Sequence, residues 1–220
     1  TAVELFEAVQ RGEIKALWIA CTNPAQSLPD LTRVHEALAV CPFVVLQEVS
    51  PHTDTAAYAD LLLPAAGWGE KEGTVTNSER RISRVRAAVA PPGEARADWR
   101  IAVDFAQRLE SRLQPDSTTL FPFASAESVF NEHRASTVGR DLDIGGLSYA
   151  VLESKGPQQW PMREGAAAGT PRLYGDGVFP TASGRACFKA VHHRPTSEAT
   201  DARLPLHLNS GRLRDQWHGM

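Results

Sequence analysis

Residues 17–48 restrict the fold of this chain more than any other stretch of its sequence. An apolar run at 16–20 is too short for a helix. Residues 27–30 then predict the start of a helix. Ser offers a capping oxygen, Pro stands where no amide is needed, and Asp places an acid near the positive end of the helix. A second apolar run at 43–46 is unbroken and rich in β-branched residues, as in a strand buried on both faces. Strand, polar loop, helix and strand together predict an α/β unit whose polar side chains gather at the carboxyl ends of parallel strands.

Composition excludes several classes of protein. The chain has 220 residues, of which 42% are apolar and 22% charged, as in a soluble protein with a hydrophobic core. Its formal net charge of −3 gives no reason to expect nucleic acid or an anionic membrane as a partner. No apolar run approaches the roughly 20 residues that span a bilayer. Cys21, Cys41 and Cys187 lack framework spacing, so the simplest interpretation is three buried thiols in a reducing compartment. We therefore predict a cytoplasmic protein.

Further elements follow in the first part of the chain. In chain order, the pattern predicts a buried strand over 60–63 ended by Pro64, a hairpin or irregular extended segment over 74–88 with a turn at Asn77 and Ser78, a long helix over 98–113, a weaker helix from Ser125 and a short helix over 147–152. Asp98 is expected to cap the long helix. The arginines of the hairpin have two open interpretations, a solvated edge that discourages strand pairing or a functional cluster; they are Arg80, Arg81, Arg84 and Arg86.

The second part of the chain differs in amino-acid composition from the first. Residues 156–184 are rich in Gly, Pro and Ala, which predicts a connection between domains. Strands are predicted over 185–191 and 204–209. The expected fold class is thus α/β, with a three-layer unit on an open, mainly parallel sheet at 1–155, a connection at 156–184 and the start of a second, β-rich domain at 185–220. The family resemblance given below implies that this last segment is the truncated start of a β-barrel domain. Because the chain stops within a dense polar motif, we expect a piece of a longer polypeptide.

Polar side chains at the predicted strand ends form the one group of residues whose chemistry suggests a ligand. Asn23, Gln47, Glu48 and Lys71 could hydrogen-bond ribose hydroxyls, the donor edge of guanine and a diphosphate, which favours a nucleotide-like ligand. The alternative is that these groups hold turns, and both interpretations stay open. The histidines stand alone or as an adjacent pair that faces opposite ways in a strand, so no metal ligand is assigned. No G-x-S-x-G, Walker or G-x-G-x-x-G motif occurs, and no catalytic residue is assigned.

Four ordered blocks resemble one protein family. They read CTNPAQSLPD, WGEKEGTVTNSERR, APPGEARADW and NSGRLRDQWHGM. In this order and at these separations, they are similar to the C-terminal half of the catalytic subunit of molybdopterin oxidoreductases, above all the cytoplasmic assimilatory nitrate reductases. The resemblance covers nearly the whole chain and is weakest over 114–145.

The resemblance implies a cofactor and its contacts. In that family a molybdenum ion is held by two molybdopterin guanine dinucleotides, bound largely through polar groups at strand ends. Matched residue by residue, the implied contacts are Asn23, Gln47, Glu48, Lys71, Asp98, Ser210, Gly211, Arg212, Gln216, Trp217 and His218. Arg212 and His218 are the side chains expected to touch a pterin or diphosphate, Gly211 lets backbone approach closely, and Ser210 stands where threonine is frequent.

The resemblance also implies an activity for the parent polypeptide, the longer protein of which this chain would be a part. The parent would reduce nitrate to nitrite with electrons from a donor protein or domain. Its 4Fe-4S cluster and its molybdenum-ligating cysteine would lie upstream, so Cys21 is not assigned to the metal, and the fragment alone is expected to be inactive. The alternatives are a fragment of a formate dehydrogenase of the same family and a non-catalytic nucleotide-binding module.

Overall fold

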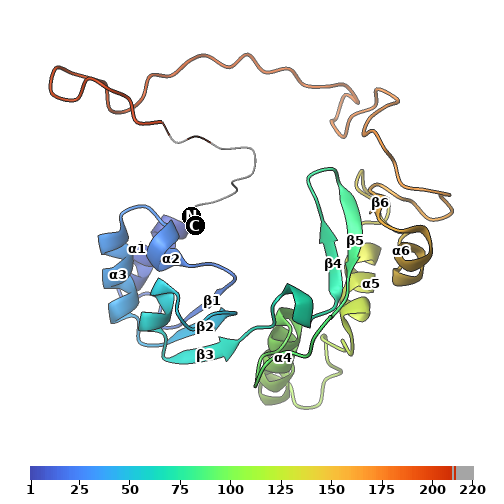
Figure 1. The fold of residues 1–220 in the computed structure, drawn as a ribbon, viewed down its shortest axis with the longest axis horizontal. Coiled ribbons are helices and arrows are strands. Elements are labelled where there is room, and N and C mark those ends of the chain that lie inside the picture. The colour runs from blue at the N-terminus through green and yellow to red at the C-terminus, as the bar shows by residue number, and fades with distance from the viewer. Residues whose placement is uncertain (210, 212–220) are drawn as a thin grey trace. The chain divides into compact units, whose positions relative to one another are not determined.

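The structure, a computed structural model, describes residues 1–209 and 211 (Figure 1). The chain divides into two units, Thr1–Leu173 and Tyr174–Met220, which are described separately. Within the described residues, no helix is long and apolar enough to cross a membrane. All regular secondary structure of the described chain belongs to the first unit.

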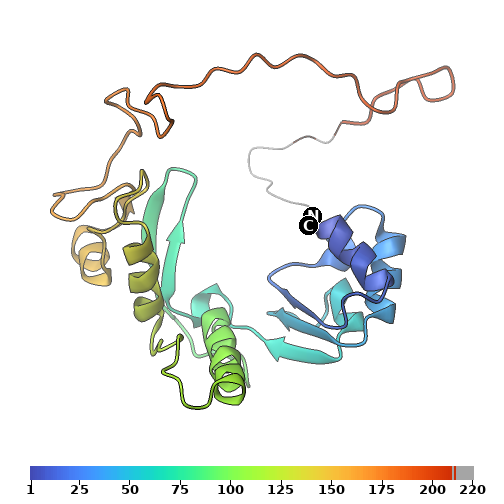
Figure 2. The same cartoon turned by 180° about the vertical axis from the view of Figure 1, so that it is seen from behind.

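A parallel sheet of three strands forms the first core. Its strands β1 (Leu17–Ala20), β2 (Val44–Glu48) and β3 (Leu61–Pro64) are hydrogen-bonded in chain order. Helices α1 (Ala2–Gln10) and α3 (Leu31–Val40) lie side by side against one face of this sheet, as Figure 2 shows from behind. Their apolar residues meet those of β1 and β2 in one cluster, in which Leu38, Val44 and Leu46 are almost completely buried. The predicted α/β class with a parallel sheet is confirmed.

The helix predicted to start at residues 27–30 is α3, and a second, short helix precedes it. Short α2 (Pro24–Ser27) begins at its proline, and α3 begins after Asp30, whose φ of 52° lies in the left-handed region and whose side chain makes no cap hydrogen bond. Ser27 does not cap α3, because its hydroxyl donates back to the carbonyl of Asn23 at 3.0 Å. A short turn thus intervenes between the loop and the long apolar stripe.

The outer face of the sheet is less covered than the sequence predicts. Strand β3 was expected to be buried, but Leu61, which pairs with Val45 and lies on this face, is exposed. Helix α4 (Asp98–Leu113) reaches this face at one place, where the ring of Phe105 meets Trp18 edge to face at 5.0 Å. The prediction of a buried strand is wrong for β3 within this chain, because the described residues supply helices to one face and only part of a layer to the other.

An antiparallel sheet forms the second core of the same unit. Strands β4 (Gly73–Thr76), β5 (Arg81–Val85) and β6 (Gln158–Gln159) pair in this order. Helices α5 (Ala126–Ser136) and α6 (Tyr149–Lys155) pack on it around the buried Leu147 and Met162. The hairpin and the helix start at Ser125, which accepts a hydrogen bond from the Ser128 amide at 3.1 Å, are confirmed. Two 3-10 turns, η1 (Asp54–Tyr58) and η2 (Trp68–Glu70), complete the elements.

Two of the hairpin arginines are structural rather than solvated. The side chain of Arg84 is only 8% exposed and lies over the ring of Tyr149 at 3.6 Å, with carboxylates of Glu72 and Glu153 each 3.3 Å away. Arg80 donates to the carbonyls of Trp160, Thr170 and Pro171. The interpretation of these two residues as a solvated edge is therefore wrong.

The first half of the predicted connection folds onto this core. Residues 158–162 contribute β6 and buried Met162, and Gly169 lies so close to Gln159 that an added Cβ would stand 2.0 Å from its carbonyl oxygen. The boundaries at residues 155 and 184 stay predictions.

The predicted start of a β-barrel is not formed by the described residues. The segments 185–191 and 204–209 contain no strand, and Phe188 and Leu208 are almost fully exposed. The two predicted strands are therefore wrong for the described chain. A strand needs a hydrogen-bonded partner, and an isolated hairpin is marginal in water even when it has one.

Candidate functional site

The carboxylate of Asp98 is the centre of a polar cluster at the carboxyl end of the parallel sheet. Gln47 Nε2 donates to Asp98 Oδ1 at 2.9 Å, and Lys71 Nζ donates to Asp98 Oδ2 at 2.7 Å. The thiol of Cys21 lies 3.8 Å from Asp98 Oδ1. Gln47 belongs to β2, Cys21 directly follows β1, and Lys71 follows η2. We call these four residues the Asp98 cluster.

Asp98 does not cap α4, contrary to the prediction. It is the first helical residue, the N-cap position is Ala97, and no side chain caps this end. Its carboxylate turns to Lys71 and Gln47 instead, while its negative charge still lies at the positive end of the helix dipole, where anions are stabilised. The helix start therefore holds an anion whose two oxygens accept hydrogen bonds from Gln47 and Lys71.

Burial and hydrogen bonding act in opposite directions on Asp98. Burial would raise the pKa of this carboxyl, but the hydrogen bonds from Lys71 and Gln47 outweigh burial and hold the pKa below its usual range. The Lys71 and Asp98 side chains are 20% and 31% exposed, so the ion pair is partly sheltered yet open to a ligand. At neutral pH the cluster presents one anion, one cation and one amide.

Cys21 is a protonated donor in this arrangement. Although the residue is exposed, partial burial of its sulfur raises the pKa of the thiol, and the charge of Asp98 raises it further. The exposed positions of Cys21 and Cys187 correct the interpretation of three buried thiols, which holds for Cys41 alone. A thiol of raised pKa is a poor nucleophile and metal ligand at neutral pH.

Asn23 and Glu48 play different parts from Gln47. Asn23 Oδ1 accepts from the Thr55 amide at 3.1 Å and from its hydroxyl at 2.6 Å, and Asn23 Nδ2 donates to Asp54 at 3.2 Å. Glu48 accepts from the Val49 amide at 2.7 Å. The turn-holding interpretation thus describes Asn23, which ties η1 to the loop after β1, whereas Gln47, Lys71 and Asp98 converge on one point.

The remaining predicted contacts lie in the last residues of the chain. Gly211 has no atom within 4 Å of an added Cβ. Ser210, Arg212, Gln216, Trp217 and His218 lie outside the described residues. Their assignment stays a prediction.

Two contacts of the cluster were not foreseen from the sequence. One is the thiol of Cys21, and the other is Trp68, whose ring centre lies 5.1 Å from Lys71 Nζ. Trp68 is 67% exposed, so its ring offers a flat surface beside the cation. A large aromatic residue three positions before Lys71 is the signal that sequence analysis could have used.

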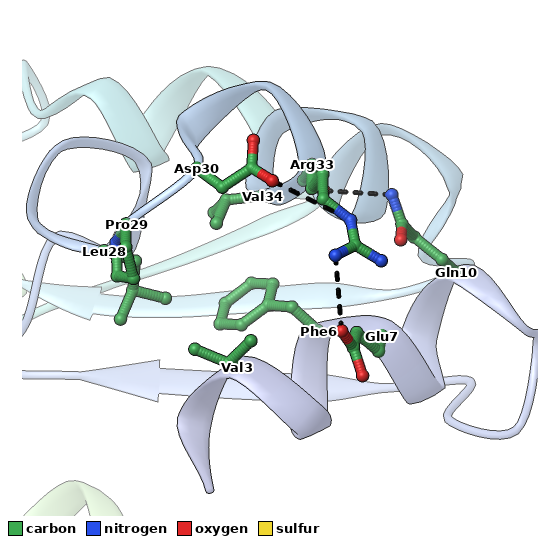
Figure 3. Close-up of a pocket in the computed structure, with 9 residues that line it drawn as sticks. All are labelled: Val3, Phe6, Glu7, Gln10, Leu28, Pro29, Asp30, Arg33 and Val34. Carbon is green, nitrogen blue, oxygen red and sulfur yellow. Dashed lines mark hydrogen bonds and ion pairs between the residues drawn. The ribbon is translucent and has the colours of Figure 1, made fainter. Parts of the chain in front are cut away.

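Other hollows of the first unit lack these features. The hollow in Figure 3, about 30 Å³ in volume, lies between α1 and α3 and is lined by Val3, Phe6 and Val34 among others. Its cation, Arg33, pairs with Glu7 at 3.3 Å. The space suits about one water molecule and contains none of the predicted site residues. Among the described residues, no group of three His, Cys, Asp or Glu side chains could hold a metal ion.

The Asp98 cluster has the chemistry to contact a guanine dinucleotide. A carboxylate accepts hydrogen bonds, so Asp98 can receive the N–H donors of a guanine edge, and the ammonium of Lys71 can meet a diphosphate. Gln47 can donate and accept. The residues present therefore fit the nucleotide end of the group that the sequence resemblance implies.

Comparison with known proteins defines the class. Residues 1–108 match the family model described as molybdopterin oxidoreductase, and the chain belongs to that family. A nitrate reductase from Klebsiella oxytoca is 45% identical and covers 100% of this chain and 25% of its own length. A nitrate reductase from Synechocystis sp. is 42% identical, with 99% and 30% covered. An F420-dependent formate dehydrogenase subunit alpha from Methanocaldococcus jannaschii is 38% identical, with 93% and 28% covered. The chain thus spans about a quarter to a third of the length of these relatives.

One solved structure shows a similar fold. Acetylene hydratase from Pelobacter acetylenicus superposes with a TM-score of 0.52 over 78% of this chain and 23% of the hydratase chain. At 19% identity, the likeness concerns the fold alone.

Proposed function

We propose that the chain is part of a molybdenum oxidoreductase that reduces nitrate to nitrite, and that it helps to bind the molybdenum-bis(molybdopterin guanine dinucleotide) cofactor. The observation that carries this proposal is the convergence of Gln47, Lys71 and Asp98. These residues come from three separate segments of the chain. Their assembly at one point of the sheet edge supports a binding site over three independent turn contacts.

The ion pair suits a ligand that carries both donors and negative charge. Moving Lys71 to a diphosphate would leave Asp98 without its cation, unless the same ligand also donates hydrogen bonds to the carboxylate. A guanine base donates from its ring N–H and amino group, so a guanine nucleotide compensates both partners at once. An adenine nucleotide offers no such pair of donors to a carboxylate. The cluster therefore favours a guanine dinucleotide on charge and hydrogen-bonding grounds.

The bound cofactor would supply the transfer of two electrons to nitrate, which takes up two protons and gives nitrite and water. The residues described here would orient the nucleotide end and keep it in place. In this proposal, the rest of the parent polypeptide carries the 4Fe-4S cluster, the electron donor is another protein or domain, and the enzyme works in the cytoplasm. A formate dehydrogenase remains the second candidate, because the Methanocaldococcus relative of that name is 38% identical.

The test uses the complete parent polypeptide with Lys71→Met and Asp98→Asn. One charge-assisted hydrogen bond is worth about 1.5–3 kcal/mol, so each variant should retain cofactor about 10–100-fold more weakly. Molybdenum content, and GMP released by acid hydrolysis, measure this retention. Lys15→Met, at an exposed position of the loop before β1, is the matched control and should keep both at wild-type level. Unchanged molybdenum and GMP in both site variants would overturn the site assignment.

Substrate choice is tested on the same preparations. The wild-type enzyme should reduce nitrate with a reduced dye as electron donor and should not oxidise formate. Formate oxidation without nitrate reduction would favour the second candidate.

A further inference from the structure

The hydroxyl of Thr55 links the loop after β1 to η1 from a completely buried position. Its Oγ1 accepts from the Ala25 amide at 3.2 Å and therefore donates its only proton to Asn23 Oδ1, at 2.6 Å. The backbone amide of Thr55 donates to the same oxygen at 3.1 Å. One buried residue thus holds the side chain of Asn23 with two donors.

These contacts decide which way the carboxamide of Asn23 points. Because the oxygen and the nitrogen of a carboxamide differ little in size, the hydrogen-bond network determines which of them lies on each side. The two donors of Thr55 require Oδ1 on the buried side. Nδ2 therefore lies on the other side, where it donates to Gln26 Oε1 at 3.3 Å and to Asp54 Oδ2 at 3.2 Å. Thr55 thus orients Asn23 as a hydrogen-bond donor.

The two ends of this carboxamide differ in how easily their partners are exchanged. Gln26 and Asp54 are exposed, so their side chains can turn to water when a ligand approaches and release the N–H groups of Nδ2 at little cost. Thr55 is buried, so water cannot replace its hydrogen bonds to Oδ1. A ligand that reaches Asn23 therefore meets a donor of fixed orientation.

The backbone that carries Asn23 has further supports. His35 Nε2 donates to the carbonyl of Ala25 at 2.8 Å, and the Ser27 amide donates to the carbonyl of Asn23 at 3.0 Å. Ala25 is itself buried. Loss of the Thr55 hydroxyl should therefore release the side chain of Asn23 more than the loop itself.

We propose that Thr55 is a positioning residue of the cofactor site, which presents the Nδ2 donor of Asn23 to an oxygen of the nucleotide. The inference rests on the proposed function, in which the ligand is a guanine dinucleotide whose ribose and diphosphate carry acceptor oxygens. Cys21 of the same loop lies 3.8 Å from Asp98 Oδ1, so the loop borders the Asp98 cluster. Thr55 itself is buried and acts through Asn23.

The test compares two threonine-to-valine variants of the complete parent polypeptide, produced in cells that do not make molybdopterin and titrated with GDP by calorimetry. Thr137 is the matched control, because it is also buried and its hydroxyl likewise donates to a carbonyl, that of Arg134, and accepts from one backbone amide, that of Ile144. Thr55→Val should bind GDP about 10-fold more weakly than the wild type, since a ligand hydrogen bond loses its oriented donor. Thr137→Val should bind GDP as the wild type does, although both variants lower the Tm.

Three further variants separate positioning from folding. Thr55→Ser keeps the hydroxyl and should bind GDP like the wild type. Asn23→Ala should bind GDP about 10-fold more weakly, and Thr55→Val added to it should cause no further loss, because both changes remove the same donor. Equal weakening by Thr55→Val and Thr137→Val, no rescue by Thr55→Ser, or additive losses in the double variant would each overturn the proposal. Unchanged GDP binding by Asn23→Ala would overturn it even if Thr55→Val does not fold.

The wild-type titration separates this inference from the proposed function. Wild-type GDP binding that Thr55→Val leaves unchanged would overturn the positioning role alone. No GDP binding by the wild-type polypeptide would overturn the proposed guanine dinucleotide site, and the positioning role with it.

Discussion

Two charged clusters in the first unit use similar groups for different ends. Arg84 is nearly buried, stacks on Tyr149 and has two carboxylates beside it. Asp98 has one cation and one amide, and its oxygens remain partly exposed. The Arg84 cluster has its partners built in, so it holds β5 and α6 together. The Asp98 cluster is partly open and chemically balanced, which allows a ligand to replace its internal partners. The central side chain is 8% exposed in the structural cluster and 31% exposed in the proposed binding cluster.

The largest expected effect on stability is at Arg84. Arg84→Met removes a nearly buried cation and leaves Glu72 and Glu153 without it, so the free energy of unfolding should fall by about 2–3 kcal/mol. Urea unfolding measures the change. Arg86→Met is the matched control, because Arg86 pairs with the same Glu153 but is exposed, and should cost at most about 1 kcal/mol. Equal losses in the two variants would remove the distinction between the clusters.

Asp98→Asn should cost less, about 1 kcal/mol at pH 7, because the pair with Lys71 is partly solvated. The pKa of Asp98 is lowered in the folded state, so its stabilisation is fully present above the unfolded value of about 3.9 and is lost as the pH falls through the folded pKa. Wild type and variant should therefore converge in acid. Urea midpoints from pH 7 down to pH 2.5 test this, and a difference that stays constant with pH would contradict the role of the charge.

Tyr149→Phe should change stability by less and in the opposite direction. The Tyr149 hydroxyl is buried without a hydrogen-bond partner in the described structure, while its ring stacks under Arg84. Removing the hydroxyl keeps the ring and relieves the unpaired group, so the free energy of unfolding should rise by up to about 1 kcal/mol. A clear loss of stability would show that the hydroxyl has a partner.

The smallest effect is expected at Cys21. Cys21→Ser keeps a donor near Asp98 and should change the free energy of unfolding by no more than about 0.5 kcal/mol. The thiol itself should react with iodoacetamide more slowly than that of Cys187, because burial and then the charge of Asp98 raise the pKa of Cys21. Peptide mass spectrometry compares the two rates. Faster labelling of Cys21 would indicate a thiolate and a different role in the cluster.

Local signals predicted the elements that depend on neighbours in sequence. The apolar runs gave β1 and β2 nearly to the residue, and Ser125 marked the start of α5. The start of α3 was misplaced, because Pro24 begins a separate turn and Asp30 adopts a left-handed backbone that no sequence pattern required. Strands over 185–191 and 204–209 were predicted from composition alone. Their formation depends on partners that the described residues do not provide.

The candidate site was predictable in membership more than in geometry. The family resemblance named Gln47, Lys71 and Asp98, and the structure brings them together. The resemblance could not reveal that the Asp98 side chain bonds Lys71 instead of capping α4, since both roles suit an acid at a helix start. Nor could it show that Asn23 ties down η1, because that contact depends on how Thr55 packs against the loop after β1.

Helix α4 connects the Asp98 cluster to the outer face of the parallel sheet. Asp98 is its first residue, and Phe105, whose ring contacts Trp18 of β1, follows two turns later, about 10 Å along the axis. A helix moves as a rigid rod over this length, so sliding by one turn, about 5.4 Å, would carry the carboxylate out of reach of Gln47. The packing of Phe105 on Trp18 thus helps to fix the carboxylate of Asp98 beside Gln47, seven residues earlier in the chain.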